Sequence, residues 1–255
     1  MKRLAAVLAV PLLIMAETGS AAMSRLDLDR LALDIWRVRA AFHTLTVMQG
    51  APAFEEQLEL VIEDTEEVLS QLADSAEGED EQAFIDSVST GWDRYRDLAG
   101  RNTVAEMGYT DHYTIVDLES EALALSRLIN ERRQEASEKG EDLADLAVRL
   151  QRITSEYMYV SAAADGGGAI GTGVEDGRVE FVTAVPDFEE RLNKAQKAWA
   201  AHPDISRNLR SVASKWAFIR ESLVKFYENS VPFVVQRYSL QMVDALNASA
   251  EMARQ

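Results

Sequence analysis

Cysteine is absent from this chain of 255 residues, and histidine occurs only three times. Without thiolate ligands, a cysteine-rich zinc site, an iron–sulfur cluster and covalently attached haem are all excluded. The histidines, His43, His112 and His202, are far apart in the sequence, and none belongs to the Glu-x-x-His motif of di-iron helical bundles. The sequence therefore predicts neither a metal site nor a cofactor.

Proline and glycine are also scarce, with 5 and 13 residues, so long stretches of the chain are free to be helical. Apolar residues recur at steps of three and four, which is typical of the seam of a helical bundle. We expect helices to begin near Pro52, Pro203 and Pro232, because proline is favoured in the first helical turn. Another helix is expected to begin at Asp187, which forms a capping-box pattern with Glu190.

Basic residues are outnumbered, since 26 Lys and Arg face 43 Asp and Glu for a formal net charge of −17. The negative electrostatic potential of such a chain repels nucleic acid and anionic lipid surfaces, so we expect no nucleic-acid partner. No long apolar stretch follows the first 22 residues. The sequence therefore predicts no membrane span after that point.

Residues 1–22 resemble a secretory signal peptide. Lys2 and Arg3 precede an apolar stretch from Leu4 to Ala16, and Ser20-Ala21-Ala22 forms a small-residue cleavage site. The apolar stretch is shorter than the ~20 residues that span a bilayer as a helix, although an uncleaved anchor is the alternative. An exported chain without disulfides is typical of the bacterial periplasm, where we expect this protein.

The chain contains an internal repeat. The apolar seam of the first half superposes on that of the second at an offset of 115 residues, which pairs Leu31, Ile35, Val38 and Phe42 with Leu146, Leu150, Ile153 and Tyr157. A repeated unit indicates a duplicated architecture, although chance similarity between two amphipathic bundles is the alternative. We therefore predict an all-α fold of two tandem up-down four-helix bundles, at 23–139 and 140–255. Gly140 is the expected seam, unless one continuous helix runs through it.

Residues 162–185 form an insertion in the second unit. Glycine is concentrated there, and Asp176-Gly177 is a hairpin turn signal before the alternating segment 178–182. The sequence thus predicts a glycine-rich loop or a small β-hairpin. This insertion is either a decoration of the surface or a lid or partner-binding finger.

Arginines recur beside the first-helix seams, while catalytic motifs are lacking. The glycine run has no phosphate-loop lysine, and no serine lies in a nucleophile elbow, so we do not expect an enzyme. Arg37 and Arg152 occupy equivalent positions of the repeat, and Arg39 and Arg149 lie next to the seams. Guanidinium groups suit planar anions, which indicates an anion site or a dimer interface. Salt bridges to neighbours such as Asp34 and Glu156 are the alternative interpretation.

The segment Leu150-Gln151-Arg152-Ile153, followed by Tyr157, resembles the Leu-Ser-Gln-Arg-Ile signature of PilJ-type domains, the sensory domains of type IV pilus chemotaxis transducers. Nitrate/nitrite sensor kinases carry a similar domain. The resemblance implies a periplasmic four-helix sensor, often a homodimer, that reads a small ligand or another protein such as a membrane chemoreceptor or sensor kinase. The candidate ligand-binding residues are Arg37, Arg39, Arg149, Gln151 and Arg152.

The chain departs from that family at informative positions. The anion-binding arginine of the nitrate sensors would fall at Ala32 and Ala147, and Trp36 replaces the signature glutamine in the first half. Nitrate binding in that mode is therefore not expected. We predict a non-enzymatic periplasmic sensory protein that binds a small ligand, an anion being one candidate, or a membrane receptor. The alternative is an envelope scaffold linked to type IV pili, in which the two bundles stand end to end as a spacer.

Overall fold

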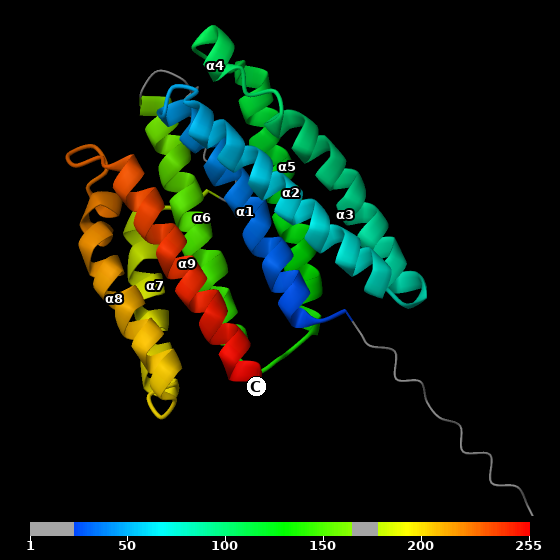
Figure 1. Ribbon diagram of the computed structural model, residues 1–255, viewed down its shortest axis with the longest axis vertical. Coiled ribbons are helices and arrows are strands. Elements are labelled where there is room, and N and C mark those ends of the chain that lie inside the picture. The colour runs from blue at the N-terminus through cyan, green and yellow to red at the C-terminus, as the bar shows by residue number, and fades with distance from the viewer. Residues whose placement is uncertain (1–22, 165–177) are drawn as a thin grey trace, which may run out of the picture.

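The computed structural model describes residues 23–164 and 178–255, and throughout these residues all regular secondary structure is helical. The prediction of an all-α fold is confirmed. The described helices, shown in Figure 1, are α1 (Arg25–Val47), α2 (Pro52–Ser75), α3 (Gly78–Ala99), α4 (Val104–Met107), α5 (His112–Glu135), α6 (Glu141–Ala164), α7 (Phe181–Ala198), α8 (Pro203–Val224) and α9 (Pro232–Arg254).

Local sequence rules account for most helix starts. Pro52, Pro203 and Pro232 each open a helix, where the missing N–H of proline costs nothing because the first-turn donors have no partner within the helix. Ser24 and Asp111 cap α1 and α5, since each side chain accepts a hydrogen bond from a backbone N–H of the first turn. These three proline starts were predicted from the sequence and are confirmed.

The long helices form two rings of four. In the first half, defined as α1 to α5, α1 contacts α2, α2 contacts α3, α3 contacts α5 and α5 contacts α1. In the second half, α6 to α9 contact one another in the same cyclic order. The short α4 lies beyond the end of the first ring (Figure 1). One continuous apolar core runs through both halves.

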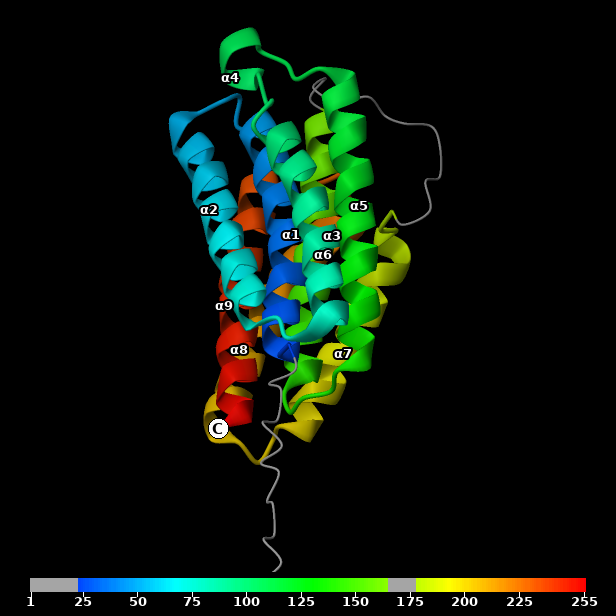
Figure 2. The ribbon, with the colours of Figure 1, turned by 90° about the vertical axis from the view of Figure 1, so that its right-hand side faces the viewer.

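The two halves pack side by side through α1 and α6, which lie at the centre of the molecule (Figures 1 and 2). These helices run parallel, because Gln151 Nε2 donates to the Trp36 carbonyl (3.5 Å) and Arg39 Nη1 donates to Ser155 Oγ (2.9 Å) further along both. The paired residues are 115 and 116 positions apart, close to the offset of the repeat. The two helices that the predicted repeat makes equivalent therefore meet in register.

This arrangement corrects two expectations about how the halves are joined. The end-to-end arrangement is wrong, because the halves are in contact along their central helices. A continuous helix through Gly140 is also wrong, since α5 ends at Glu135 and α6 begins at Glu141. Gly140 has a φ of +89°, which is outside the right-handed helical region and turns the chain into α6.

The insertion also differs from its prediction where the structure describes it. Residues 178–180 have no regular structure, and Phe181 and Val182 form the first turn of α7, so the predicted strand at 178–182 is wrong. Helix α7 thus begins six residues before Asp187 and contains Pro186 in its second turn, where the missing N–H removes one helical hydrogen bond. The turn at Asp176-Gly177 and the leader at 1–22 lie outside the described residues.

Among residues 23–164 and 178–255, no helix is both long and apolar enough to cross a bilayer.

Candidate functional site

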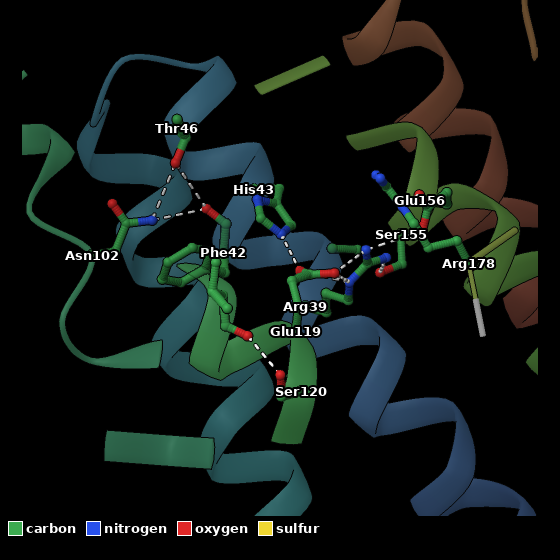
Figure 3. Close-up of polar contacts among 12 residues, drawn as sticks. Arg39, Phe42, His43, Thr46, Asn102, Glu119, Ser120, Ser155, Glu156 and Arg178 are labelled. Atoms are coloured by element: carbon green, nitrogen blue, oxygen red, sulfur yellow. Dashed lines mark hydrogen bonds and ion pairs between the residues drawn. The ribbon is translucent and has the colours of Figure 1, made fainter. Parts of the chain in front are cut away.

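A largely buried group of polar and charged side chains lies where α1, α5 and α6 meet, and we call it the interface cluster: Arg39, His43, Glu119, Ser155 and Glu156 (Figure 3). Arg39 of α1 is 3% exposed and donates through Nε to both Glu119 oxygens of α5, at 2.9 and 2.8 Å. Its Nη atoms reach Ser155 Oγ (2.9 Å) and Glu156 Oε2 (3.0 Å) on α6. A single guanidinium therefore ties both halves together.

The electrostatics of the interface cluster keep Glu119 ionised. Burial alone would raise the pKa of Glu119, but the Arg39 charge and hydrogen bonds from His43 and Arg39 outweigh it and lower the pKa from 4.5 to about 2. Burial lowers the pKa of His43, and this outweighs the attraction of Glu119. The imidazole is therefore neutral near pH 7, and its Nε2–H donates to Glu119 Oε1 at 2.9 Å.

Two aromatic rings support three guanidinium groups beside this cluster. Arg39 lies 5.8 Å from the centroid of Trp36 and 5.1 Å from that of Tyr159. Arg152 lies over the Trp36 ring at 5.1 Å, and Arg178 lies over the Tyr159 ring at 4.6 Å. The negative face of each ring attracts the cations, which lets three arginines gather in a small volume.

Two of these arginines reach a cavity of about 360 Å³ beside α6 and α7, which we call the arginine cavity. Its polar lining comes from Arg149, Arg152, Arg178, Glu180, Thr183 and Asp187, and its apolar lining from Ile153, Val179, Ala184 and Phe188. Arg178 Nε contacts Glu156 Oε1 at 3.2 Å, while Arg149 Nη1 contacts Asp187 Oδ2 at 3.1 Å. The cavity thus combines guanidinium donors with an apolar surface, as small-molecule sites commonly do.

The charge of Arg152 is disfavoured by its surroundings. Burial, followed by the neighbouring Arg39 charge, lowers the pKa of Arg152, and Glu156 only partly offsets this. The side chain is half-buried at the edge of the interface cluster and faces the arginine cavity. A negative group placed in the cavity would stabilise this cation.

The structure brings together only some of the five residues predicted as a site. Arg149 and Arg152 line the arginine cavity, and Gln151 is buried against α1, where it bonds the Trp36 carbonyl. Arg39 lies inside the interface cluster, 3% exposed. Arg37 is separate, because it is ion-paired with Asp34 of its own helix at 2.8 Å. The five residues therefore do not form one site.

The alternative interpretation, salt bridging, holds for Arg37 with Asp34 and for Arg39 with Glu156. Sequence reasoning missed Glu119, His43 and Arg178. The first two belong to helices distant in sequence, and no local pattern links them. Arg178 was assigned to a strand, and its position near the end of the glycine-rich insertion was the only available signal.

In the described part of the chain, no three His, Asp or Glu side chains gather in a group that could hold a metal ion. No protein-family model matches this sequence, and neither a curated protein nor a solved structure matches it significantly.

Proposed function

We propose that this chain is a non-enzymatic sensory protein that binds a small organic anion in the arginine cavity. The observation that carries this proposal is the meeting of Arg149, Arg152 and Arg178 at one cavity with an apolar wall. Guanidinium groups bind carboxylate and phosphate with paired N–H donors, and stacking on Trp36 and Tyr159 restricts where Arg152 and Arg178 can point.

The size of the cavity supports an organic ligand over an inorganic ion. About 360 Å³ lies in the lower part of the usual range for small-molecule sites. The half-buried Val179 and Ala184 would face a hydrocarbon portion, and the arginines would face the acidic group. A carboxylate or phosphate ester with an apolar body therefore fits better than nitrate.

The shared carboxylate Glu156 offers a route from the cavity to the rest of the molecule. Glu156 Oε1 contacts Arg178 at the cavity, while Oε2 contacts Arg39 at 3.0 Å in the interface cluster. A bound anion competes with Glu156 for Arg178, and the freed carboxylate then strengthens its contact with Arg39. Ligand binding thereby changes the charge balance between the halves, which is what a sensor needs.

The periplasmic location and a receptor partner belong to this proposal through the PilJ resemblance. Of the two signature residues on α6, Arg152 lines the arginine cavity, and Gln151 donates to the Trp36 carbonyl of α1. A membrane chemoreceptor or sensor kinase would receive the changed state of the protein.

The test is calorimetric titration of the purified chain with benzoate, succinate, phenyl phosphate and nitrate. We expect an organic anion to bind and Arg152→Gln to weaken it by roughly tenfold or more, because a charge-assisted hydrogen bond is lost. Arg207→Gln is the matched control, since Arg207 is an exposed arginine on α8 that pairs with Asp204 of the same helix. Circular dichroism checks that each variant is folded.

Equal weakening in both variants would mean that binding follows net charge and would refute the assignment of the cavity. No binding by any organic anion would favour the scaffold interpretation instead.

A further inference from the structure

A second groove, on the other side of the central helix pair, has the opposite charge. It measures about 310 Å³ and lies between α1, α2 and α9, and we call it the acidic groove. Its carboxylates are Asp34 of α1 with Asp64 and Glu67 of α2, and Asn247 contributes from α9. Figure 2 shows α2 and α9 on one side of the central pair and α5 and α7 on the other.

The arginines that border the acidic groove are already engaged by carboxylates. Arg37 contacts Asp34 at 2.8 Å and Asp64 at 3.6 Å. Arg30 contacts Glu251 at 3.0 Å and Asp27 at 3.8 Å. The two guanidiniums thus share four carboxylates between them, so negative charge remains in excess around the groove.

Two carboxylate groups of the acidic groove retain capacity to accept hydrogen bonds. Asp34 is 4% exposed, and within the described residues only its Oδ1 accepts a hydrogen bond, from Arg37, while Oδ2 accepts none. Burial raises the pKa of Asp34, so its negative charge is under-compensated. On α2, Glu67 accepts from the Gln71 amide at 3.1 Å and makes no ion pair in the part of the chain that the structure describes.

The surrounding helix strengthens this negative potential. Helix α2 contains eight acidic residues and no basic residue over Pro52–Ser75. An electrostatic potential of one sign raises the local concentration of oppositely charged ligands at a concave surface. A cation that enters the groove is therefore favoured before it makes any specific contact.

The internal repeat relates this groove to the arginine cavity. At the offset of 115, Asp34 and Arg37 of α1 are equivalent to Arg149 and Arg152 of α6, and both pairs line a cavity. The charge is reversed at the first position of each pair. The same location in the duplicated unit thus presents a carboxylate in one half and a guanidinium in the other.

We propose that the acidic groove binds a small organic amine in its ammonium form. Ammonium groups carry several N–H donors, which match the carboxylates of Asp34, Asp64 and Glu67 and the amide oxygens of Gln71 and Asn247. A bare divalent cation fits less well, because the described residues contain no cluster of three acidic ligands at metal-binding spacing. This proposal is independent of the arginine cavity.

The experiment is calorimetric titration of the purified chain with 1,4-diaminobutane at 0.1 M salt. The double variant Asp64→Asn/Glu67→Gln is expected to raise the dissociation constant by at least about tenfold. The matched control is Glu55→Gln/Glu59→Gln, which removes the same charge from exposed positions of α2 outside the groove. The control and the cavity variant Arg152→Gln are expected to bind the diamine as the unchanged chain does.

Three results would overturn the proposal. They are no heat of binding at millimolar diamine, equal weakening in the two double variants, and tighter binding of magnesium than of the diamine with the same dependence on Asp64 and Glu67. Because all substituted positions are on the surface of α2 or half-exposed, thermal unfolding serves to show that each variant keeps the fold.

Discussion

Replacement of Arg39 by methionine gives the most direct test of the interface cluster. The substitution keeps an unbranched side chain but removes the cation that Glu119 and Glu156 share. The lowering of the Glu119 pKa from 4.5 to about 2 corresponds to about 3 kcal/mol of stability near pH 7. Loss of one partner from a buried ion pair typically costs about 3–5 kcal/mol, which agrees with that value.

The pH dependence of this effect has a definite sign. In the unchanged chain, the folded pKa of Glu119 is below its ordinary value, so its contribution is present above pH 4.5 and is lost as the pH falls towards 2. Without Arg39, burial raises the pKa of Glu119, so the folded variant gains protons and relative stability on acidification. His43 shifts in the same direction, because Arg39 also helps to lower its pKa. The stability difference should therefore narrow from pH 7 to pH 4.

The assay is urea unfolding followed by circular dichroism between pH 4 and 7.5. Arg94→Met is the control, since Arg94 makes a comparable ion pair with Glu121 (2.8 Å) at the exposed surface and should change stability little at any pH. A stability difference that stays constant with pH, or one no larger than that of the control, would contradict the reasoning.

Two further substitutions, each of one residue, test the packing of the first half. Gly50→Ala should lower the free energy of unfolding by roughly 2–4 kcal/mol, because Gly50 has a φ of +72° and an added Cβ would lie 2.3 Å from the Ala105 Cα. Gly100→Ala is the control and should be near neutral, because the nearest atom to its added Cβ is 3.6 Å away. Tyr95→Phe should cost about 1–2 kcal/mol, because the buried Tyr95 hydroxyl donates to the Ile35 carbonyl at 2.9 Å. The midpoint of thermal unfolding measures both effects. Equal midpoints for the two glycine variants would contradict the first prediction, and an unchanged midpoint for the tyrosine variant would contradict the second.

Local sequence patterns predicted the helices well where a single residue type decides the outcome. Proline opened α2, α8 and α9 as expected, because its fixed φ and missing N–H suit the first turn of a helix. The start of α7 was placed too late, since the capping-box pattern at Asp187 lies inside a helix that begins at Phe181. Packing of Phe181 against Tyr157, with ring centroids 6.0 Å apart, favours the longer helix, and this contact has no local signature.

The candidate site was predicted only in part, for a related reason. The arginines next to the seams were visible in the sequence, since their spacing relative to apolar residues places them beside the apolar seam of each helix. Their partners were not, because the pairing of Arg39 with Glu119 depends on how α5 packs against α1. The repeat offset of 115 does give the register in which α1 packs against α6. The sequence alone, however, does not show that these two equivalent helices pack against each other.

The five-residue link 136–140 between α5 and α6 makes the pairing of the two halves an intramolecular event. The effective concentration of one half around the other is then on the order of millimolar or higher, so dilution does not separate them. In a symmetric dimer, every substitution appears on both sides of the interface at once. Here each side can change alone, which is why tryptophan at position 36 can pack against the repeat in which glutamine stands at the equivalent position 151.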